Sequence, residues 1–259
     1  MCGIAGVLWT KPRSDGASEA SAIGGEMTDL LAHRGPDGAG QAKARSGNGR
    51  DTIGVLGHRR LAVVDEAGGT TPVLAGAGGY DTQEVAHAAK EMQAAGADGL
   101  LSVTPYYNRP TPEGLVAHYA VIADATPLPI IVYNVPGRTG CNVDPATLVR
   151  LAALPHVVGV KEASGNVTQI CEALKAVPTD FVVLSGDDAL TLPAMAVGAR
   201  GVISVASNEC PAEMARLVEA AEGNDFAAAR EIHARLLPLM LANFAESNPI
   251  PVKAAMARM

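Results

Sequence analysis

Residues 156–165 read HVVGVKEASG, an apolar run that ends in a lysine. Residues 157–160 hold no polar side chain, which is typical of a strand buried on both faces of a parallel sheet covered by helices. Such a strand has no reason to end in a long cation unless that cation serves a structural or chemical purpose. Lys161 is therefore informative about both the fold and the function.

Similar apolar runs recur after Pro72 and are separated by amphipathic segments. The six runs are residues 73–77, 99–104, 129–134, 157–161, 181–185 and 201–205. Between the first three runs, residues 82–96 and 112–126 carry apolar side chains at helical spacing on one face. These side chains are Val85, Ala89 and Met92 in the first segment and Leu115, Tyr119 and Ile122 in the second. The repeat predicts strand–helix units around a parallel sheet.

Two α/β architectures fit such a repeat. An open doubly wound sheet of the nucleotide-binding kind would carry a glycine-rich phosphate turn after its first strand, and the AGAGGYD of residues 75–81 lacks that spacing. A TIM-type β/α barrel fits better, although a closed barrel needs eight strands and six runs are visible.

Residues 1–71 have a different pattern. An apolar start, CGIAGVLW, is followed by a polar, glycine-rich middle and then by TIGVLGH and LAVVD, which flank Arg59 and Arg60. These short runs resemble antiparallel strands more than strand–helix units. We therefore expect two parts, residues 1–71 and residues 72–259.

Composition excludes several classes of function. The 259 residues are 48% hydrophobic with a net charge of −7 and no basic cluster, which argues against nucleic acid or an anionic membrane as a partner. The four cysteines have no paired zinc spacing, and no signal peptide or 18-residue apolar span is evident. We expect a cytoplasmic protein with reduced thiols and no metal.

Reactive side chains gather at the expected strand ends, where a barrel carries its active site. Lys161 closes one run, Tyr133 lies near the end of another, and Arg138 follows it in the next turn. A desolvated lysine can attack a ketone to form an imine, a phenol can transfer the protons, and a guanidinium can bind the carboxylate of an α-keto acid. Taken singly, Lys161 would be a charged residue that discourages edge pairing of the strand, Tyr133 a buried phenol of the core, and Arg138 a solvent-exposed loop residue. Their shared position at strand ends favours a site.

The motifs around these residues resemble one enzyme family. They are TPYYNRPTPEGL (104–115), YNVPGRTG (133–140), GVKEASGN (159–166), SGDDAL (185–190), GVISVASN (201–208) and NPIPVK (248–253). From about residue 72 onward the chain is similar to the 4-hydroxy-tetrahydrodipicolinate synthase (dihydrodipicolinate synthase) family, pyruvate-dependent class I aldolases. The resemblance implies a lyase that joins pyruvate to aspartate semialdehyde in lysine and diaminopimelate biosynthesis. It also implies a homo-oligomer, a dimer or tetramer, without a cofactor other than the covalent imine.

The resemblance assigns roles to particular residues. Lys161 would form the Schiff base with pyruvate, and Tyr133 would relay protons. Tyr107 would be a second relay phenol, presented across a dimer interface. Arg138 would bind the carboxylate of the aldehyde substrate. The pyruvate pocket would be lined by Gly186 and Ile203.

The chain departs from that family near its start. The family has two further βα units and a Gly-Thr-Thr-Gly-Glu loop, whereas here Gly69-Thr70-Thr71 is followed by Pro72. The expected fold is thus a TIM-type β/α barrel lacking its usual first two βα units. Because the missing threonines would complete the proton relay, the activity of this chain stays an open question.

The first 71 residues carry a second resemblance. MCGIAGVLW, LAHRGPDGAG (31–40) and LGHRRLAVVD (56–65) are similar to the start of a class II glutamine amidotransferase domain of the asparagine synthetase type. That likeness would make Cys2 an N-terminal nucleophile and Arg60 a glutamine-binding residue, although the Asn-Gly-Glu segment of that family is missing. Three functions remain open on the sequence: the pyruvate-dependent lyase, a residual amidotransferase, and an inactive chimera of two enzyme fragments.

Overall fold

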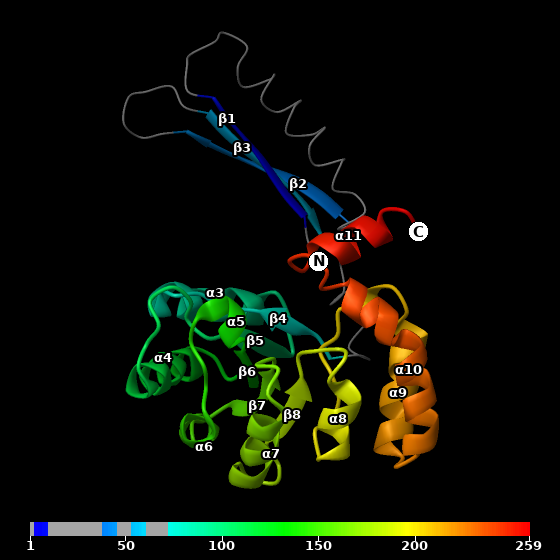
Figure 1. Ribbon diagram of the computed structural model, residues 1–259. Coiled ribbons are helices and arrows are strands. Elements are labelled where there is room, and N and C mark those ends of the chain that lie inside the picture. Colours follow the sequence, from blue (N-terminus) through cyan, green and yellow to red (C-terminus); the bar gives the residue numbers. More distant parts are fainter. Residues whose placement is uncertain (1–2, 10–37, 46–52, 61–71) are drawn as a thin grey trace. The chain divides into compact units, whose positions relative to one another are not determined.

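The computed structural model describes residues 3–9, 38–45, 53–60 and 72–259, and for the first three stretches it describes the backbone alone. The chain divides into two compact units, Met1–Pro72 and Val73–Met259. Figure 1 labels the elements of both units.

The N-terminal unit contains a three-stranded antiparallel sheet. Its strands are β1 (Gly3–Trp9), β2 (Gly38–Arg45) and β3 (Ile53–Arg60), in the order β1-β3-β2. The antiparallel reading of CGIAGVLW and TIGVLGH is therefore confirmed, while LAVVD (61–65) lies outside the described residues. β2 was not predicted, because its GAGQAKAR has glycine and alanine in place of the β-branched and aromatic residues that are typical of strands.

The C-terminal unit is an α/β structure around a five-stranded parallel sheet. The strands are β4 (Leu74–Gly76), β5 (Gly99–Val103), β6 (Ile130–Asn134), β7 (Val157–Glu162) and β8 (Val182–Ser185). They pair in chain order, and every neighbouring pair is parallel. Sequential parallel pairing is the pattern of a β/α barrel, whose strands follow one another around the sheet.

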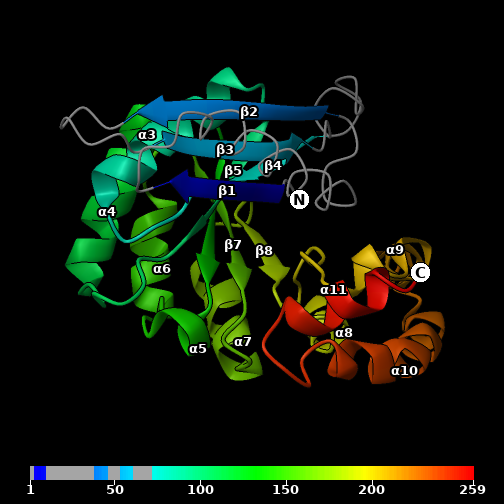
Figure 2. The same ribbon diagram turned by 90° about the horizontal axis from the view of Figure 1, so that it is seen from above.

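A helix whose N-terminus is capped by a side chain follows each of the first four strands. α3 (Thr82–Ala94), α4 (Pro112–Ala125), α6 (Pro145–Ala152) and α7 (Val167–Ala176) each begin after a side chain that accepts a backbone N–H of the first turn. The capping residues are Asp81, Thr111, Asp144 and Asn166. Helices α4, α6 and α7 lie along one side of the sheet (Figure 1; Figure 2). The predicted face of α4 is buried, since Leu115, Tyr119 and Ile122 are at most 1% exposed.

The prediction of a sixth strand over residues 201–205 is wrong in its extent. Val202 forms a single parallel bridge with Ser185, and the ladder stops there. Gly201 has a φ of +152°, which bends the chain before the bridge, and Asp188 accepts the backbone N–H groups of Val205 and Ala206. Those two N–H groups are therefore bonded to a side chain instead of a neighbouring strand.

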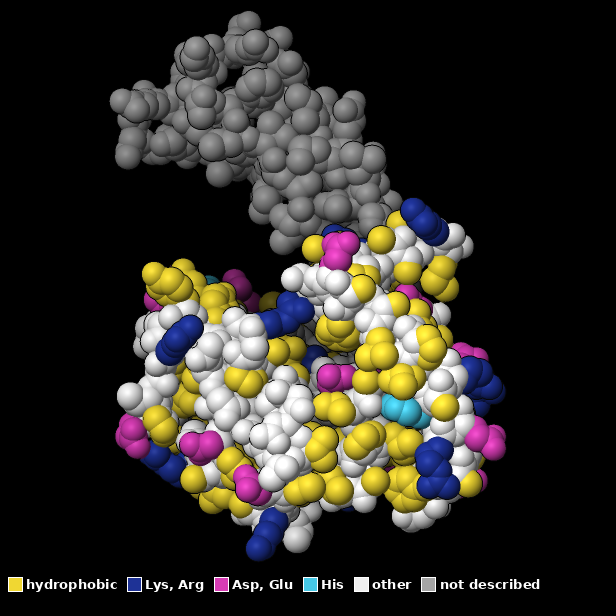
Figure 3. Space-filling view, viewed as in Figure 1, with side chains coloured by type: hydrophobic (Ala, Val, Ile, Leu, Met, Phe, Trp, Pro, Cys, Tyr) yellow, Lys and Arg dark blue, Asp and Glu magenta, His cyan; other side chains and the backbone are white. Residues whose placement is uncertain are grey.

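Most of the helices that follow β8 pack around two small apolar clusters. The helices after β8 are α8 (Thr191–Ala196), the 3₁₀ helix η2 (Ala206–Asn208), α9 (Pro211–Glu222), α10 (Phe226–Ala242) and α11 (Ile250–Met256). Helices α9 and α10 lie side by side (Figure 1; Figure 2). Met214, Leu217, Leu236 and Met240 fill the space between them. Hydrophobic side chains also remain visible on this part of the surface (Figure 3), and Leu241 is 58% exposed. Within the described residues, no helix is both long and apolar enough to cross a membrane.

The two faces of the parallel sheet differ in burial. Ser102, Val132, Val160 and Val183 form one row across β5–β8 and are at most 1% exposed. The next row is Val103, Tyr133, Lys161 and Leu184, and these side chains are partly exposed. Because successive side chains of a strand point to opposite faces, the first row faces the helices and the second faces the inner side of the sheet.

A buried histidine links α3 to α4. His118 is 4% exposed, and its Nδ1 lies 2.8 Å from the hydroxyl oxygen of Thr82. Burial lowers the pKa of His118 to about 4 from an ordinary value of 6.5. The histidine is therefore neutral at neutral pH, where it packs edge to face against Tyr119.

This histidine predicts acid sensitivity. The unfolded chain takes up a proton near pH 6.5 that the folded chain resists until about pH 4, so the free energy of unfolding should fall as pH drops through that window. We expect a loss on the order of 2 kcal/mol from this residue. Denaturant unfolding at pH 7 and pH 4.5 should show a smaller loss in His118→Gln. The control His87→Gln, at a histidine whose side chain is 75% exposed, should behave as the wild type does. Equal losses in all three proteins would contradict the assignment.

Candidate active site

The site is built on the carboxyl ends of β6 and β7, where Tyr133 and Lys161 are directly opposite each other in the ladder. Parallel neighbours in register present their side chains on the same face. The Nζ of Lys161 consequently lies 4.1 Å from the centroid of the Tyr133 ring. The structure thus brings together the two residues that the sequence selected for imine chemistry.

The environment of Lys161 favours a reactive amine. Its pKa is lowered to about 8, chiefly by burial; the nearby Asp188 carboxylate opposes this shift, and the Arg138 guanidinium adds to it. An ordinary exposed lysine has a pKa near 10.5. With a pKa of about 8, Lys161 is unprotonated in roughly a tenth of the molecules at pH 7, which is enough for nucleophilic attack.

Tyr133 keeps its proton in this setting. Burial raises the pKa of its phenol, and the positive charge of Arg138 opposes that rise. Within residues 72–259 the hydroxyl makes no hydrogen bond. A protonated phenol with its donor and acceptor both available can pass a proton to or from a ligand beside Lys161.

Gly186, which the family resemblance assigns to the pyruvate pocket, lies against the Lys161 side chain. Its backbone N–H donates to the carbonyl of Glu162 at 2.7 Å, which draws the β8 end toward β7. A β-carbon at position 186 would lie 3.0 Å from Lys161 Cε, 3.1 Å from Lys161 Cγ and 2.6 Å from the β-carbon of Ala163. Only glycine leaves the lysine in its present place.

This contact makes Gly186→Ala a test of the pocket. The added methyl group should displace Lys161 from Tyr133, and we expect imine formation with pyruvate to fall by about 10-fold or more. The rate at which borohydride traps the imine measures the effect. Gly223→Ala, at a helix end away from the strand ends, should leave the rate unchanged. An unchanged rate in Gly186→Ala would mean that Lys161 is not held in the position described.

Arg138 lies in α5 (Pro136–Thr139), the short helix that follows β6. Its side chain is exposed, and Nη1 donates to the carbonyl of Asn248 at 3.0 Å, just before α11. Arg138 and Tyr133 both line a cavity of about 510 Å³, which also includes Gly76, Val103 and Tyr106. Lys161 does not line this cavity directly but contacts Tyr133 from the neighbouring strand.

The other predicted site residues are Ile203, Tyr107, Arg60 and Cys2. Ile203 is beside the end of β8, because its N–H donates to the Ser185 carbonyl at 2.9 Å. Tyr107 follows β5 with a φ of +72° and is 92% exposed, so within one chain it contributes little to the pocket. Arg60 ends β3 in the N-terminal unit, and its side chain is not described. Cys2 lies outside the described residues.

Two carboxylates at these strand ends were not assigned a role from the sequence. Asp188 is 1% exposed and accepts the N–H groups of Val205 and Ala206 at 3.0 and 2.8 Å. Glu162 is 3% exposed and lies on the opposite face of β7 from Lys161. Their positions after a strand end were a signal, but their burial depends on backbone and side-chain donors from distant segments. Among the residues that the structure describes, no group of His, Cys, Asp and Glu could hold a metal ion.

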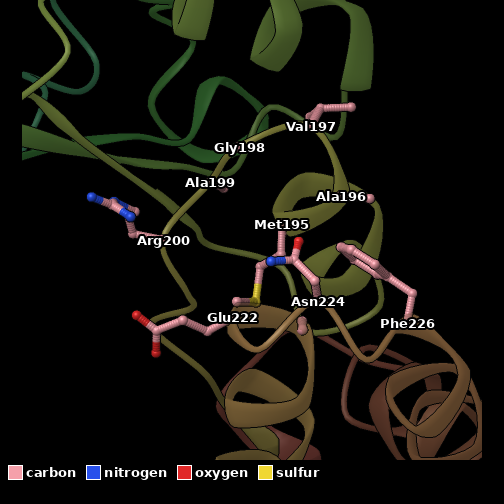
Figure 4. Close-up of a pocket in the computed structure, with 10 residues that line it drawn as sticks. Met195, Ala196, Val197, Gly198, Ala199, Arg200, Glu222, Asn224 and Phe226 are labelled. Atoms are coloured by element: carbon pink, nitrogen blue, oxygen red, sulfur yellow. The ribbon is translucent and has the colours of Figure 1, made fainter.

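A second cavity, of about 470 Å³, is shown in Figure 4. It is formed by the chain from Met195 to Arg200, which precedes the Val202 bridge, and by the turn between α9 and α10. Arg200 and Glu222 lie on one side of it, with Phe226 on the other (Figure 4). None of the predicted site residues lines this cavity. The candidate active site is therefore the inner face at the carboxyl ends of β6, β7 and β8.

Known proteins resemble the chain over most of its length. Residues 60–259 match the dihydrodipicolinate synthetase family, and residues 1–82 match a glutamine amidotransferase domain. A 4-hydroxy-tetrahydrodipicolinate synthase of Koribacter versatilis is 52% identical over 74% of this chain, and the chain spans 64% of that relative's length.

Solved structures show the same likeness. The crystal structure of dihydrodipicolinate synthase from Aquifex aeolicus has a TM-score of 0.73 and 46% identity, covering 75% of this chain and 67% of that one. The chloride-inhibited dihydrodipicolinate synthase of Acinetobacter baumannii, complexed with pyruvate, has a TM-score of 0.74 and 41% identity, covering 76% of this chain and 67% of that one. Over the aligned residues, the C-terminal unit thus shares the β/α-barrel fold of these enzymes.

Proposed function

The chain belongs to the dihydrodipicolinate synthetase family, and from this premise we propose that its C-terminal unit forms a Schiff base between Lys161 and pyruvate and joins pyruvate to aspartate semialdehyde. The observation that carries the proposal is the half-buried amine of Lys161, 4.1 Å from the Tyr133 ring at the carboxyl ends of two adjacent strands. The Acinetobacter baumannii enzyme bound to pyruvate supports the choice of keto acid.

The chemistry begins with the neutral amine. Lys161 Nζ attacks the keto carbon of pyruvate, and the resulting carbinolamine loses its hydroxyl as water to give an iminium. Loss of a proton from the methyl group then gives an enamine, whose carbon attacks the aldehyde carbon of the second substrate while the aldehyde oxygen takes up a proton. Attack on the remaining iminium by water or by the amine of the second substrate then breaks the bond to Lys161 and frees the lysine. Each step moves a proton to or from oxygen or carbon, and Tyr133 is the phenol within reach of Lys161.

Arg138 is proposed to bind the carboxylate of the aldehyde substrate. It shares the cavity with Tyr133, and one guanidinium nitrogen already donates to Asn248. A guanidinium has five N–H donors, so enough remain for a carboxylate. Gly186 and Ile203 are proposed to border the bound pyruvate. Tyr107, exposed in the single chain, is proposed to act as a relay phenol in the active site of a second copy within a homo-oligomer.

Residues 1–71 are proposed to derive from a class II glutamine amidotransferase and to stand in the sequence where the barrel's usual first two βα units would be. The match of residues 1–82 to a glutamine amidotransferase domain supports this origin. The antiparallel pairing of β1, β2 and β3 is also unlike a βα unit. No glutaminase function is proposed, because no described residue supports one.

Trapping with borohydride tests the proposed function. Incubation with pyruvate and borohydride should add one reduced pyruvate group to the chain, and peptide mapping should place it on Lys161. The exposed lysines Lys90, Lys175 and Lys253 serve as internal controls and should remain unmodified. A folded protein without an adduct, or with the adduct on an exposed lysine, would refute the proposal.

A further inference from the structure

A second pair of residues lies behind Tyr133 and Lys161. Asn134 and Glu162 are the next residues of β6 and β7, and they too are opposite each other in the ladder. They face the helices, and their exposures are 0% and 3%. The Asn134 amide donates to Glu162 Oε2 at 2.8 Å, which joins the two strand ends by a side-chain bond.

Every oxygen of the Glu162 carboxylate is bonded. Oε1 accepts the Ser164 N–H at 2.6 Å, and Oε2 accepts the Gln169 amide at 3.2 Å as well as that of Asn134. A carboxylate buried to this degree is costly unless such donors satisfy it. The bonds connect β6, β7 and α7 around a single group.

The same pair organises the backbone around the site. The carbonyl of Asn134 accepts the Ala163 N–H at 2.8 Å, and the carbonyl of Glu162 accepts the Gly186 N–H at 2.7 Å. Asn134 Oδ1 accepts the Val143 N–H at 3.0 Å. Thus the loop that carries Gly186 against Lys161 depends on the position of Glu162.

We propose that Glu162 and Asn134 form a buried brace that holds Lys161 against Tyr133, so that Glu162 is a positioning residue for imine formation and never contacts substrate. The inference rests on the proposed function. Side chains alternate between the two faces of a strand. Bonds that fix Asn134 and Glu162 on the helix-facing side therefore also fix the direction in which Tyr133 and Lys161 point on the other side. Misplacement of reacting groups by about 1 Å can lower a rate by about 100-fold, so a brace of this kind affects rate more than binding.

Glu162→Gln tests the brace with little change in size. An amide in place of the carboxylate sets an NH₂ group against either Ser164 N–H or the two side-chain amides, so at least one bond is lost. At saturating pyruvate, borohydride trapping at Lys161 should slow by about 10-fold or more, while the half-saturating pyruvate concentration should change by less than about 3-fold.

Asn142→Ala is the matched control. Asn142 belongs to the same network, bonded to Asn134 at 3.0 Å and to Gln169 at 2.9 Å, but its removal leaves the bond between Asn134 and Glu162 in place. Its trapping rate should stay within about 3-fold of the wild type. The inference is wrong if the trapping rate falls in both variants in proportion to the fall in their melting temperatures. The network would then only stabilise the fold.

The double variant Asn134→Asp/Glu162→Gln exchanges the carboxylate and the amide across the bond and should restore part of the rate lost in Glu162→Gln. No recovery in a folded double variant would contradict the brace. If Glu162→Gln does not fold, Asn134→Ala is to be measured instead, since it leaves the Ser164 and Gln169 donors on the carboxylate.

A second readout separates this inference from the proposed function. The pH dependence of Lys161 labelling by an amine-directed reagent reports its pKa without pyruvate. Tyr133, Arg138 and Asp188 are the titratable or charged groups that act on this amine. We expect the midpoint to move from about 8 toward 10.5 in Glu162→Gln, as the amine becomes more exposed, and to stay near 8 in Asn142→Ala. An unmoved midpoint overturns the brace. If the midpoint moves in Glu162→Gln but the wild type forms no pyruvate adduct, the pair holds the amine in place, and it is the proposed function and the role in imine formation that are refuted.

Discussion

Lys161→Arg is expected to form no adduct with pyruvate and to lose turnover by at least about 10³-fold. Arginine keeps the positive charge beside Tyr133, but its guanidinium stays protonated at any pH at which the protein is folded. Lysine at this position has a pKa of about 8 because burial disfavours its charged form. The variant therefore removes the free amine while leaving most of the local electrostatics unchanged.

The measurement is mass spectrometry after borohydride treatment, together with a coupled assay of pyruvate consumption. Lys175→Arg is the matched control, because Lys175 is an exposed lysine in the last turn of α7. It should form the adduct at the wild-type rate. An adduct that persists in Lys161→Arg would assign the nucleophile to another amine and remove the basis of the proposed mechanism.

The fold of the C-terminal unit could be predicted well where apolar runs alternate with amphipathic segments. Burial of Leu115, Tyr119 and Ile122 follows from helical spacing alone. The run 201–205 looked like the others, yet it forms a single bridge, because pairing depends on partners that a local pattern does not contain. β2 was missed for the opposite reason, since it pairs despite a polar, alanine- and glycine-rich sequence.

Some residues of the candidate site could be predicted from the sequence and others could not. Tyr133 and Lys161 could be selected from the sequence because parallel strands bring their carboxyl ends to one edge of a sheet, and the ladder places the two residues opposite each other. Glu162 and Asp188 could not, because a carboxylate is normally expected at the surface. Their burial depends on donors such as Gln169 and Ala206, which only the tertiary structure brings near. The role proposed for Tyr107 would depend on a second chain.

Tyr133→Phe is expected to slow imine formation and turnover by about 10²–10³-fold. Phenylalanine keeps the ring that lies 4.1 Å from Lys161 Nζ, so the packing and the cation–π contact remain. Only the hydroxyl is lost, and with it the group that can move protons during carbinolamine and enamine formation. Pyruvate binding should change much less than the rate.

Single-turnover trapping at saturating pyruvate measures this rate apart from binding. Tyr106→Phe is the matched control, because Tyr106 lines the same cavity but packs edge to face against Tyr80. Its rate should remain within about 3-fold of the wild type. If Tyr133→Phe traps pyruvate as fast as the wild type, the proton must travel by another group. The place of Tyr133 beside Lys161 would then reflect packing of the strand ends alone.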